Sequence, residues 1–446
     1  MGIYVFAKEW VPSVLYFGAI LVLILALTGR VTACLMYLLP LYPLQNVYEK
    51  LFVFPLGEKI STLLIVAMLV GWGTSKGGAK EPFFVPSPFN VLLILYMVFT
   101  YWSLWMGSQF LGPNVLASIA DARLQVSIAD TRLQVWKGYI LLQVLFFIVV
   151  NNVRTKAQIM QILIITCATM VVMDYYNIRQ VTEMGSWLSR EKFNGTFNLG
   201  ANEVAAFYVT YTFILLGLWI LEPKEIKYRP LFLFLIISNF FLVLFLFSRG
   251  AYLAFLIAWC FISINRKPLW IIPVVITLLF WQSILPDEVI NRITFSEVEG
   301  ALDESAAKRL VLWEQSINYF INNPILGIGF NVFQHQGLHY DTHNIYLRTA
   351  TEQGIIGIFF LEAIFILSFT RGWLLYRHTD DPFFKGLGIG FCTCVLSMMV
   401  VNIFGDRWTH IPLNAFFWVF LGMVERGHFL VSSTATTLNP VHSTHL

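Results

Sequence analysis

Long apolar stretches recur along nearly the whole of this sequence, and they limit its fold more than any other feature. A stretch of about 20 apolar residues can cross the hydrocarbon core of a bilayer as a helix. The sequence therefore predicts an all-α polytopic membrane protein with about twelve transmembrane helices. The expected spans are residues 10–28, 31–44, 58–75, 88–108, 136–153, 158–176, 202–221, 231–247, 250–265, 268–285, 353–376, 383–404 and 411–426.

The composition agrees with this prediction and excludes other classes of protein. Of the 446 residues, 57% are hydrophobic and only 12% are charged, a balance that a soluble domain of this length does not need. The formal net charge of +3 is spread thinly, so we expect no nucleic-acid partner. The cysteines all lie inside apolar runs, so we expect neither disulfides nor a zinc site: Cys34, Cys167, Cys260, Cys392 and Cys394.

Basic residues set the expected orientation of the spans. Lysine and arginine in short loops are retained on the cytoplasmic side during membrane insertion. Here they gather on alternate loops, so we expect those loops to be cytoplasmic and the remaining loops to be external. The basic loops lie at 76–80, 154–156, 224–229, 266–267 and 371–377.

This orientation divides the chain into four predicted regions. Residues 1–285 hold transmembrane helices 1 to about 10, and residues 353–426 hold the C-terminal ones. Residues 286–352 form a large external loop, whose segment VLWEQSINYFINNPILGIGF has helical periodicity and predicts an ordered cap. Residues 427–446 are polar and predict a disordered cytoplasmic tail.

One external loop contains a tandem repeat. SIADARLQV at 118–126 is followed directly by SIADTRLQV at 127–135. Two copies are too few for a repeat architecture, which needs at least three stacked units to bury a core. We therefore expect a local duplication that is neutral for function.

Arginines on the external side stand beside or within apolar runs. Arg249 is the clearest case, because apolar residues flank Ser248-Arg249-Gly250 on both sides. A charge at the centre of a span costs about 2.5–3.5 kcal/mol on insertion scales. Arg309 and Arg190 lie in the segments AAKRLVLWEQS and WLSREKFNG. Guanidinium groups bind phosphate oxygens by charge-assisted hydrogen bonds, so the three predict a phosphate or pyrophosphate site; contact with headgroups or solvent is the alternative.

Histidines follow at every fourth position, at His335, His339 and His343. On one continuous helix this spacing could hold a metal ion. However, Gly337 interrupts such a helix, and no cysteine or carboxylate cluster completes a site. We therefore expect no metal site.

A helix is predicted to begin at Asp341 or Thr342, either of which is a suitable N-cap. His343 would then lie in its first turn, where the helix dipole favours a neutral imidazole that can accept a proton. Arg348 and Glu352 would form an i, i+4 pair on the other side of the helix. His343 is therefore the predicted general base, with an ordinary loop histidine as the alternative.

These segments resemble the O-antigen ligase and polymerase superfamily. The pattern His-Asn-x-Tyr-Leu, then Glu-x-Gly-x-x-Gly, is carried here by His343, Asn344, Tyr346, Leu347, Glu352, Gly354 and Gly357. Similar too are Ser248-Arg249-Gly250, Arg309-x-x-x-Trp313 and Asn323-Pro324-x-x-Gly327-x-Gly329. The layout, with one large external loop before the last helices, is also similar.

The resemblance implies a GT-C-like, metal-independent, inverting glycosyltransferase of the bacterial inner membrane, with its site on the periplasmic face and no cofactor. Its donor would be a glycan linked to undecaprenyl pyrophosphate. Its acceptor would be a sugar hydroxyl of lipid A-core in a ligase, or another lipid-linked repeat in a polymerase. His343 would be the general base and Arg249, Arg309 and Arg190 would bind pyrophosphate. The supporting residues would be Asp341, Asn344, Tyr346, Arg348 and Glu352.

Other functions remain open on the sequence. They are a polymerase of O-antigen or exopolysaccharide repeats, a protein-glycosylating relative, and, from a different class, a transporter of lipid-linked glycan or polysaccharide. Intramembrane arginines also mark transport pathways. A transporter often has inverted repeats with paired broken helices, and the segments around Arg249 and His343 have no second copy in the sequence. We therefore place O-antigen ligase first.

Overall fold

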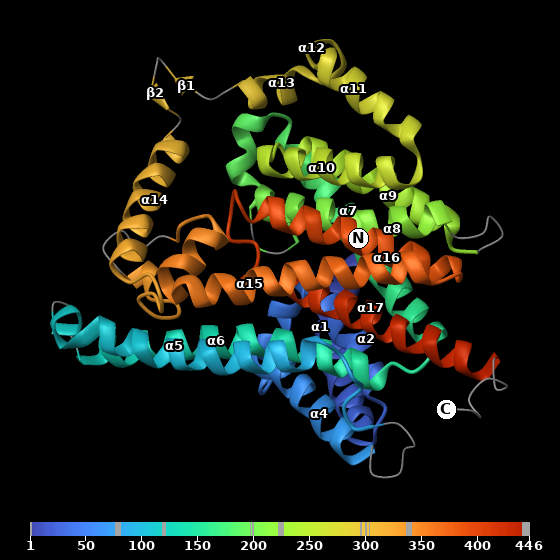
Figure 1. Cartoon of the computed structure of the whole chain (residues 1–446), viewed down its shortest axis with the longest axis horizontal. Coiled ribbons are helices and arrows are strands. Elements are labelled where there is room, and N and C mark those ends of the chain that lie inside the picture. The colour runs from blue at the N-terminus through green and yellow to red at the C-terminus, as the bar shows by residue number, and fades with distance from the viewer. Residues whose placement is uncertain are drawn as a thin grey trace, which may run out of the picture.

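A computed structural model describes residues 2–75, 82–117, 122–196, 198, 200–221, 227–294, 297–298, 301–302, 304–335 and 341–438. Helices dominate this part of the chain (Figure 1), so the fold is that of an all-α polytopic membrane protein, as predicted. The strands found in it are the two-residue segments β1 (Glu297–Val298) and β2 (Ala301–Leu302), which pair in antiparallel fashion.

The helices follow one another with short connections. In the first half they are α1 (Gly2–Leu27), α2 (Val31–Leu41), α3 (Gln45–Tyr48), α4 (Ile60–Ser75), α5 (Phe89–Ala117), α6 (Ala122–Asn152), α7 (Lys156–Met184), α8 (Ala201–Leu221) and α9 (Arg229–Phe245). In the second half they are α10 (Arg249–Arg266), α11 (Ile271–Leu279), α12 (Trp281–Ile284), α13 (Asp287–Thr294), α14 (Glu304–Asn322), α15 (Ile345–His378), α16 (Pro382–Val401) and α17 (Ile411–Leu438). Short 3-10 helices cover Glu49–Val53, Gly57–Lys59, Trp187–Lys192, Pro268–Trp270 and Phe333–His335.

Length and composition identify the helices that can span a membrane. Within the described residues, 7 helices qualify, in α1, α5, α6, α7, α8, α15 and α16. Helices α2 and α9 and the segment Pro268–Leu279 are apolar but shorter. The chain is therefore a multi-pass membrane protein, while the number of about twelve spans stays a prediction.

Two predicted boundaries are wrong. The apolar run 268–285 is not one span, because Phe280 leaves the helical conformation (φ −119°, ψ 26°) and separates α11 from α12. The 9 residues of α11 make a helix of about 14 Å, half the thickness of the hydrocarbon core. At the other end of the chain, α17 continues to Leu438 where a disordered tail was predicted from residue 427. His428 on α17 is tied to the Arg371 carbonyl of α15 at 2.8 Å, which extends the helix contact past that boundary.

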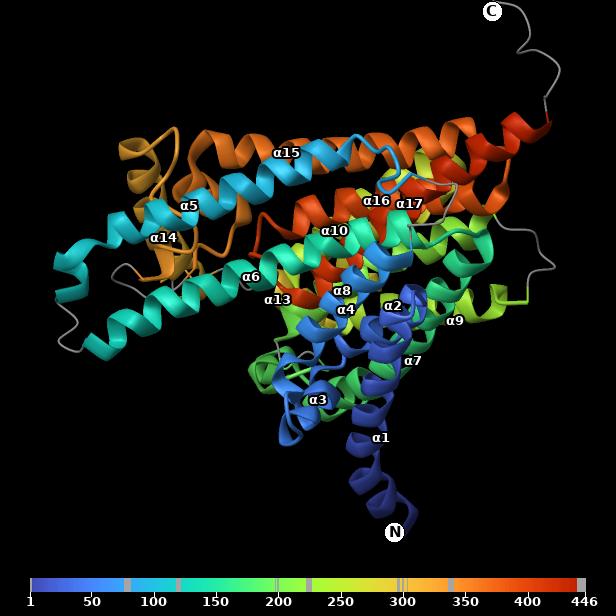
Figure 2. The same cartoon turned by 90° about the horizontal axis from the view of Figure 1, so that it is seen from below.

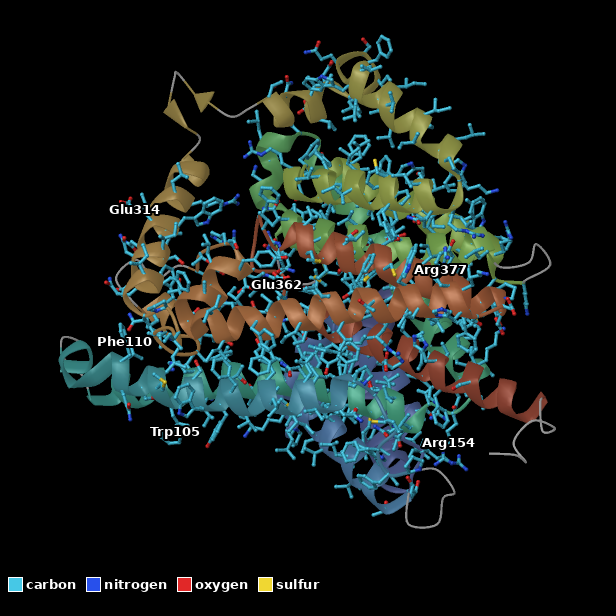
Figure 3. The ribbon with its side chains drawn as sticks, viewed as in Figure 1. Trp105, Phe110, Arg154, Glu314, Glu362 and Arg377 are labelled. Atoms are coloured by element: carbon cyan, nitrogen blue, oxygen red, sulfur yellow. The ribbon has the colours of Figure 1, made fainter. Side chains whose placement is uncertain are left out.

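Helices α15, α16 and α17 run through the centre of the bundle (Figure 1). Helix α16 packs against α8 and α15, and α17 packs against α6. Helices α5 and α6 lie along α15 and extend beyond its start (Figure 2). In Figure 3, Glu314 marks α14 at this end of α15, whereas Arg377 marks the opposite end. We call this end, formed by α14, the start of α15 and the loop 402–410, the His343 end.

Candidate active site at the His343 end

His343 lies just before α15 and is held by Asp341. The backbone N of His343 donates to Asp341 Oδ1 at 2.7 Å, and its ring Nδ1 lies 3.0 Å from the same oxygen. A proton on Nδ1 that is shared with this carboxylate leaves Nε2 as the proton acceptor. Because 44% of the His343 side chain is exposed, a substrate can approach the ring.

The prediction that Asp341 or Thr342 caps the helix is wrong. Asn344 is the N-cap, because its Oδ1 accepts from two backbone N–H groups of the first turn at 2.9 and 3.1 Å. His343 therefore precedes the helix and has a positive φ of 50°. The Asp341 carboxylate closes a turn onto the His343 amide instead of capping the helix. A carboxylate, and not a place in the first turn, thus orients the imidazole.

Arg348 joins α15 to two other segments. Its predicted i, i+4 pair with Glu352 is present, with 3.5 Å between Arg348 Nε and Glu352 Oε2, and both side chains are buried. Arg348 also pairs with Asp406 of the loop 402–410 and donates to Asn331 Oδ1 at 2.8 Å. Glu352 in turn accepts from the Asn331 backbone N at 2.9 Å. This buried network ties together three segments that are distant in sequence.

Asp406 is ionised within this network. Burial alone would raise the pKa of its carboxyl, but the charges of Arg348 and His410 and hydrogen bonds from Thr409 and Arg348 hold that pKa below its ordinary value. Tyr346 provides a further tie, since its hydroxyl donates to the Met399 carbonyl of α16 at 2.9 Å. Asn344 and Tyr346, predicted as supporting residues, thus fix the start of α15.

The two glycine-containing motifs of the family resemblance contact each other directly. Gly327 and Gly354 both have positive φ, 69° and 65°, and Gly354 interrupts α15 with a kink. The Gly329 backbone N donates to the Glu352 carbonyl at 2.8 Å, and the Ile355 N donates to the Pro324 carbonyl at 2.8 Å. A Cβ on Gly327 would lie 2.5 Å from Gln353 N, so only glycine fits this approach.

We expect Gly327→Ala to lower the stability of the purified protein strongly. The positive φ would cost about 1–3 kcal/mol for a residue with a Cβ, and the contact with the α15 backbone about 1–3 kcal/mol more. The midpoint of thermal unfolding in detergent measures this loss. Gly73→Ala is the matched control, because a Cβ on Gly73 meets nothing within 4 Å. Equal midpoints for the two variants would contradict the close approach.

Arginines from three segments line one cavity of about 290 Å³. Arg249 opens α10, Arg309 belongs to α14 and Arg407 belongs to the loop 402–410. Gly250 and Ala251 of the first turn of α10 line the same cavity. Amides of a first helical turn lack partners within the helix and favour anions. The cavity therefore suits an anion such as a phosphate group.

An apolar groove of about 730 Å³ adjoins this cavity. It runs between α9, α10 and the α11–α13 segment, and its wall includes Phe240, Tyr252, Trp259 and Trp281. Arg249 lines both the groove and the arginine cavity, and it is the one charged side chain among the described residues that line the groove. An anionic group and a long apolar chain can therefore be bound side by side, joined at Arg249.

Helix α14 connects the arginine cavity with His343. Arg309 and Trp313 lie four residues apart, so they share one face of α14. Trp313 Nε1 donates to the Thr342 carbonyl at 2.8 Å, next to His343. Ser316, further along the helix, bonds Thr351 of α15. The general-base candidate and the arginine cavity are thus neighbours across one helix.

Some predicted site residues are not placed. The Arg190 side chain and His339 lie outside the described part of the structure. His335 ends a 3-10 helix, and its prediction as one of three metal-ligand positions had already been set aside. Among the side chains that the structure describes, no group of three or more His, Cys, Asp or Glu residues is arranged to hold a metal ion.

The sequence prediction missed the loop 402–410, which contributes Asp406 and Arg407. The signal was an adjacent pair of opposite charges, Asp-Arg, in a short turn between two apolar runs. The tandem repeat is also more than an insertion in structural terms. Arg132 of its second copy is buried and donates to the Phe330 carbonyl from Nη2 at 2.7 Å and from Nε at 3.1 Å.

Comparison with known families agrees with this arrangement. The family model described as O-antigen ligase matches residues 230–361, a range that contains Arg249, Arg309 and His343. No curated protein matches the chain. The family match supports membership of the chain in the O-antigen ligase/polymerase superfamily, whose members are glycosyltransferase-like enzymes.

Proposed function

We propose that the protein is an O-antigen ligase of the bacterial inner membrane. It transfers a glycan from undecaprenyl pyrophosphate to a sugar hydroxyl of lipid A-core at the periplasmic face, with inversion at the anomeric carbon. Arg249, Arg309 and Arg407 bind the pyrophosphate, and His343 is the general base. Arg190 stays a proposed pyrophosphate ligand on the family resemblance alone.

The position of Arg249 carries this proposal. A polyprenyl pyrophosphate has an anionic head and a long apolar chain, and Arg249 lies where the arginine cavity meets the apolar groove. Guanidinium groups bind pyrophosphate oxygens with charge-assisted hydrogen bonds, while burial of the chain adds the hydrophobic contribution. A soluble nucleotide sugar would use the cavity but would leave the groove empty.

The chemistry follows from the two neighbouring parts of the site. The acceptor hydroxyl gives its proton to His343 Nε2, and its oxygen forms a bond to the anomeric carbon of the donor sugar. The bond from that carbon to the phosphate oxygen breaks, and its electron pair stays on the oxygen. The arginines stabilise the charge that develops there. A base positioned for this transfer accelerates the reaction by about 10²–10⁴-fold.

The purified protein in lipid nanodiscs tests the proposal directly. It is supplied with undecaprenyl-pyrophosphate-linked glycan, either with lipid A-core or with more donor alone, and the products are separated by mass. We expect glycosylated lipid A-core in the first reaction and no elongated lipid-linked glycan in the second.

Elongated lipid-linked glycan from donor alone would identify a polymerase of the same superfamily instead. Absence of any transfer, together with movement of the lipid-linked glycan across the membrane of liposomes, would favour the transporter. Each outcome therefore selects one function.

A further inference from the structure

The loop 402–410 holds Arg407 at the wall of the arginine cavity. Asn402 Oδ1 accepts from the backbone N of Arg407 at 2.9 Å and from that of Trp408 at 2.8 Å, so the loop is closed onto its own start. Gly405 leaves room for the guanidinium, since a Cβ there would lie 2.5 Å from Arg407 Cζ. Only 7% of the Arg407 side chain is exposed. Packing therefore fixes the direction of this third arginine.

Glu203 pairs with Arg407. It belongs to the first turn of α8, and its carboxylate contacts Arg407 Nη1. The neighbouring Asn202 lines the arginine cavity, whereas Glu203 itself does not. His410 lies close to both members of the pair, and burial followed by the charge of Arg407 lowers its pKa. At pH 8 the His410 ring is therefore neutral, and the negative charge beside Arg407 comes from Glu203.

The proposed reaction changes the charge of the bound pyrophosphate. In the donor both ends of the pyrophosphate are esterified, so it carries two negative charges. After transfer the sugar is replaced by a free phosphate oxygen, whose second ionisation has a pKa of about 6. At pH 8 the product, undecaprenyl pyrophosphate, therefore carries one negative charge more than the donor. A site with stronger positive potential would hold the product more tightly than the donor.

Building on the proposed function, we propose that Arg407 is a third pyrophosphate-binding residue and that Glu203 is a positioning carboxylate that disfavours the product relative to the donor. Its negative charge opposes the additional charge of the product, which favours release after each transfer. Glu203 also holds the Arg407 guanidinium in place while the cavity is being filled.

Equilibrium binding at pH 8 tests this role. The probes are undecaprenyl pyrophosphate and undecaprenyl pyrophosphate that carries one N-acetylglucosamine. For Glu203→Gln we expect the affinity for the first probe relative to the second to rise about five- to thirtyfold, as for a unit charge removed at roughly 8–15 Å in an effective dielectric of about 20. Arg407→Gln should weaken both probes by about ten- to a hundredfold, as for a lost charge-assisted hydrogen bond.

Further variants separate charge from structure. Glu203→Asp keeps the charge and should keep the wild-type ratio of the two affinities. The double variant Glu203→Gln, Arg407→Gln removes one charge of each sign, so its ratio should return close to the wild-type value although both probes bind weakly. Glu183→Gln removes a carboxylate of α7 that pairs with the exposed Arg179, and it should change nothing.

Two results would overturn the inference. One is a Glu203→Gln variant whose ratio of affinities equals that of the wild type, and the other is an Arg407→Gln variant that binds both probes normally. A purely structural role of the pair would lower both affinities in proportion and leave the ratio unchanged. Failure of the wild type to bind either probe would instead contradict the proposed function itself.

Discussion

His343→Ala is expected to lower the rate of glycan transfer by about 10²–10⁴-fold, which is the usual contribution of a positioned general base. Donor binding should remain close to that of the wild type, because the arginine cavity is lined by other residues. The loss should therefore appear in kcat and not in the affinity for donor. The measurement is the turnover of lipid A-core in nanodiscs, with donor binding determined separately.

Two further variants make the result specific to the imidazole and its carboxylate. His378→Ala removes an exposed histidine at the far end of α15 and should leave the rate unchanged. Asp341→Asn should lower kcat in the same direction as His343→Ala, because an amide can hold the ring in the wrong tautomer. If His343→Ala transferred glycan at the wild-type rate, His343 would not be the base.

Arg348→Met is expected to lower the free energy of unfolding by about 3–5 kcal/mol, as when one partner of a buried ion pair is removed. The variant would leave the carboxylates of Glu352 and Asp406 buried without their cation, and the Asn331 side chain without its donor. The arginine is thus needed to keep α15, the turn at 331 and the loop 402–410 together. Thermal unfolding in detergent measures the loss.

The matched control is Arg179→Met, which removes the arginine of another i, i+4 pair with a glutamate. The Arg179–Glu183 pair is solvent-exposed, so we expect a loss of only about 0.3–0.5 kcal/mol. If both variants lost the same stability, the Arg348 network would contribute no more than a surface pair does.

The pH dependence of stability provides a second measurement on this network. The pKa of Asp406 is held below its ordinary value, so its contribution to stability is fully present above that value, about 3.9 in unfolded chains, and is lost as the pH falls further. Arg348→Met removes the main opposing charge, and burial then raises this pKa. The acid-induced loss of stability should therefore begin at higher pH in the variant than in the wild type.

Motifs along the chain predicted part of the candidate site. Arg249, Arg309 and His343 stand out in the sequence because each is polar beside an apolar run, and the structure brings the two arginines to one cavity and His343 next to the helix that carries Arg309. The i, i+4 spacing of Arg348 and Glu352 also predicted a contact that is present. These predictions depend on neighbours in sequence, which spacing can reveal.

Other features depended on contacts between distant segments. The N-cap position was mispredicted because Asp341, Thr342 and Asn344 are all good capping residues, and the choice was made by the turn that Asp341 closes onto His343. The break between α11 and α12 was missed because the apolar pattern of 268–285 is the same in one long helix and in two short ones.

The sequence by itself determined that this chain is a multi-pass helical membrane protein of the O-antigen ligase/polymerase superfamily, because apolar length and motif order are local properties. Only the tertiary structure decided which charges meet. Arg407 and Glu203 are about 200 residues apart in the chain, and Arg348 meets Asp406 across the kinked start of α15. Such pairs form because glycines let backbones approach closely and because a buried charge must find its partner wherever the fold brings one near.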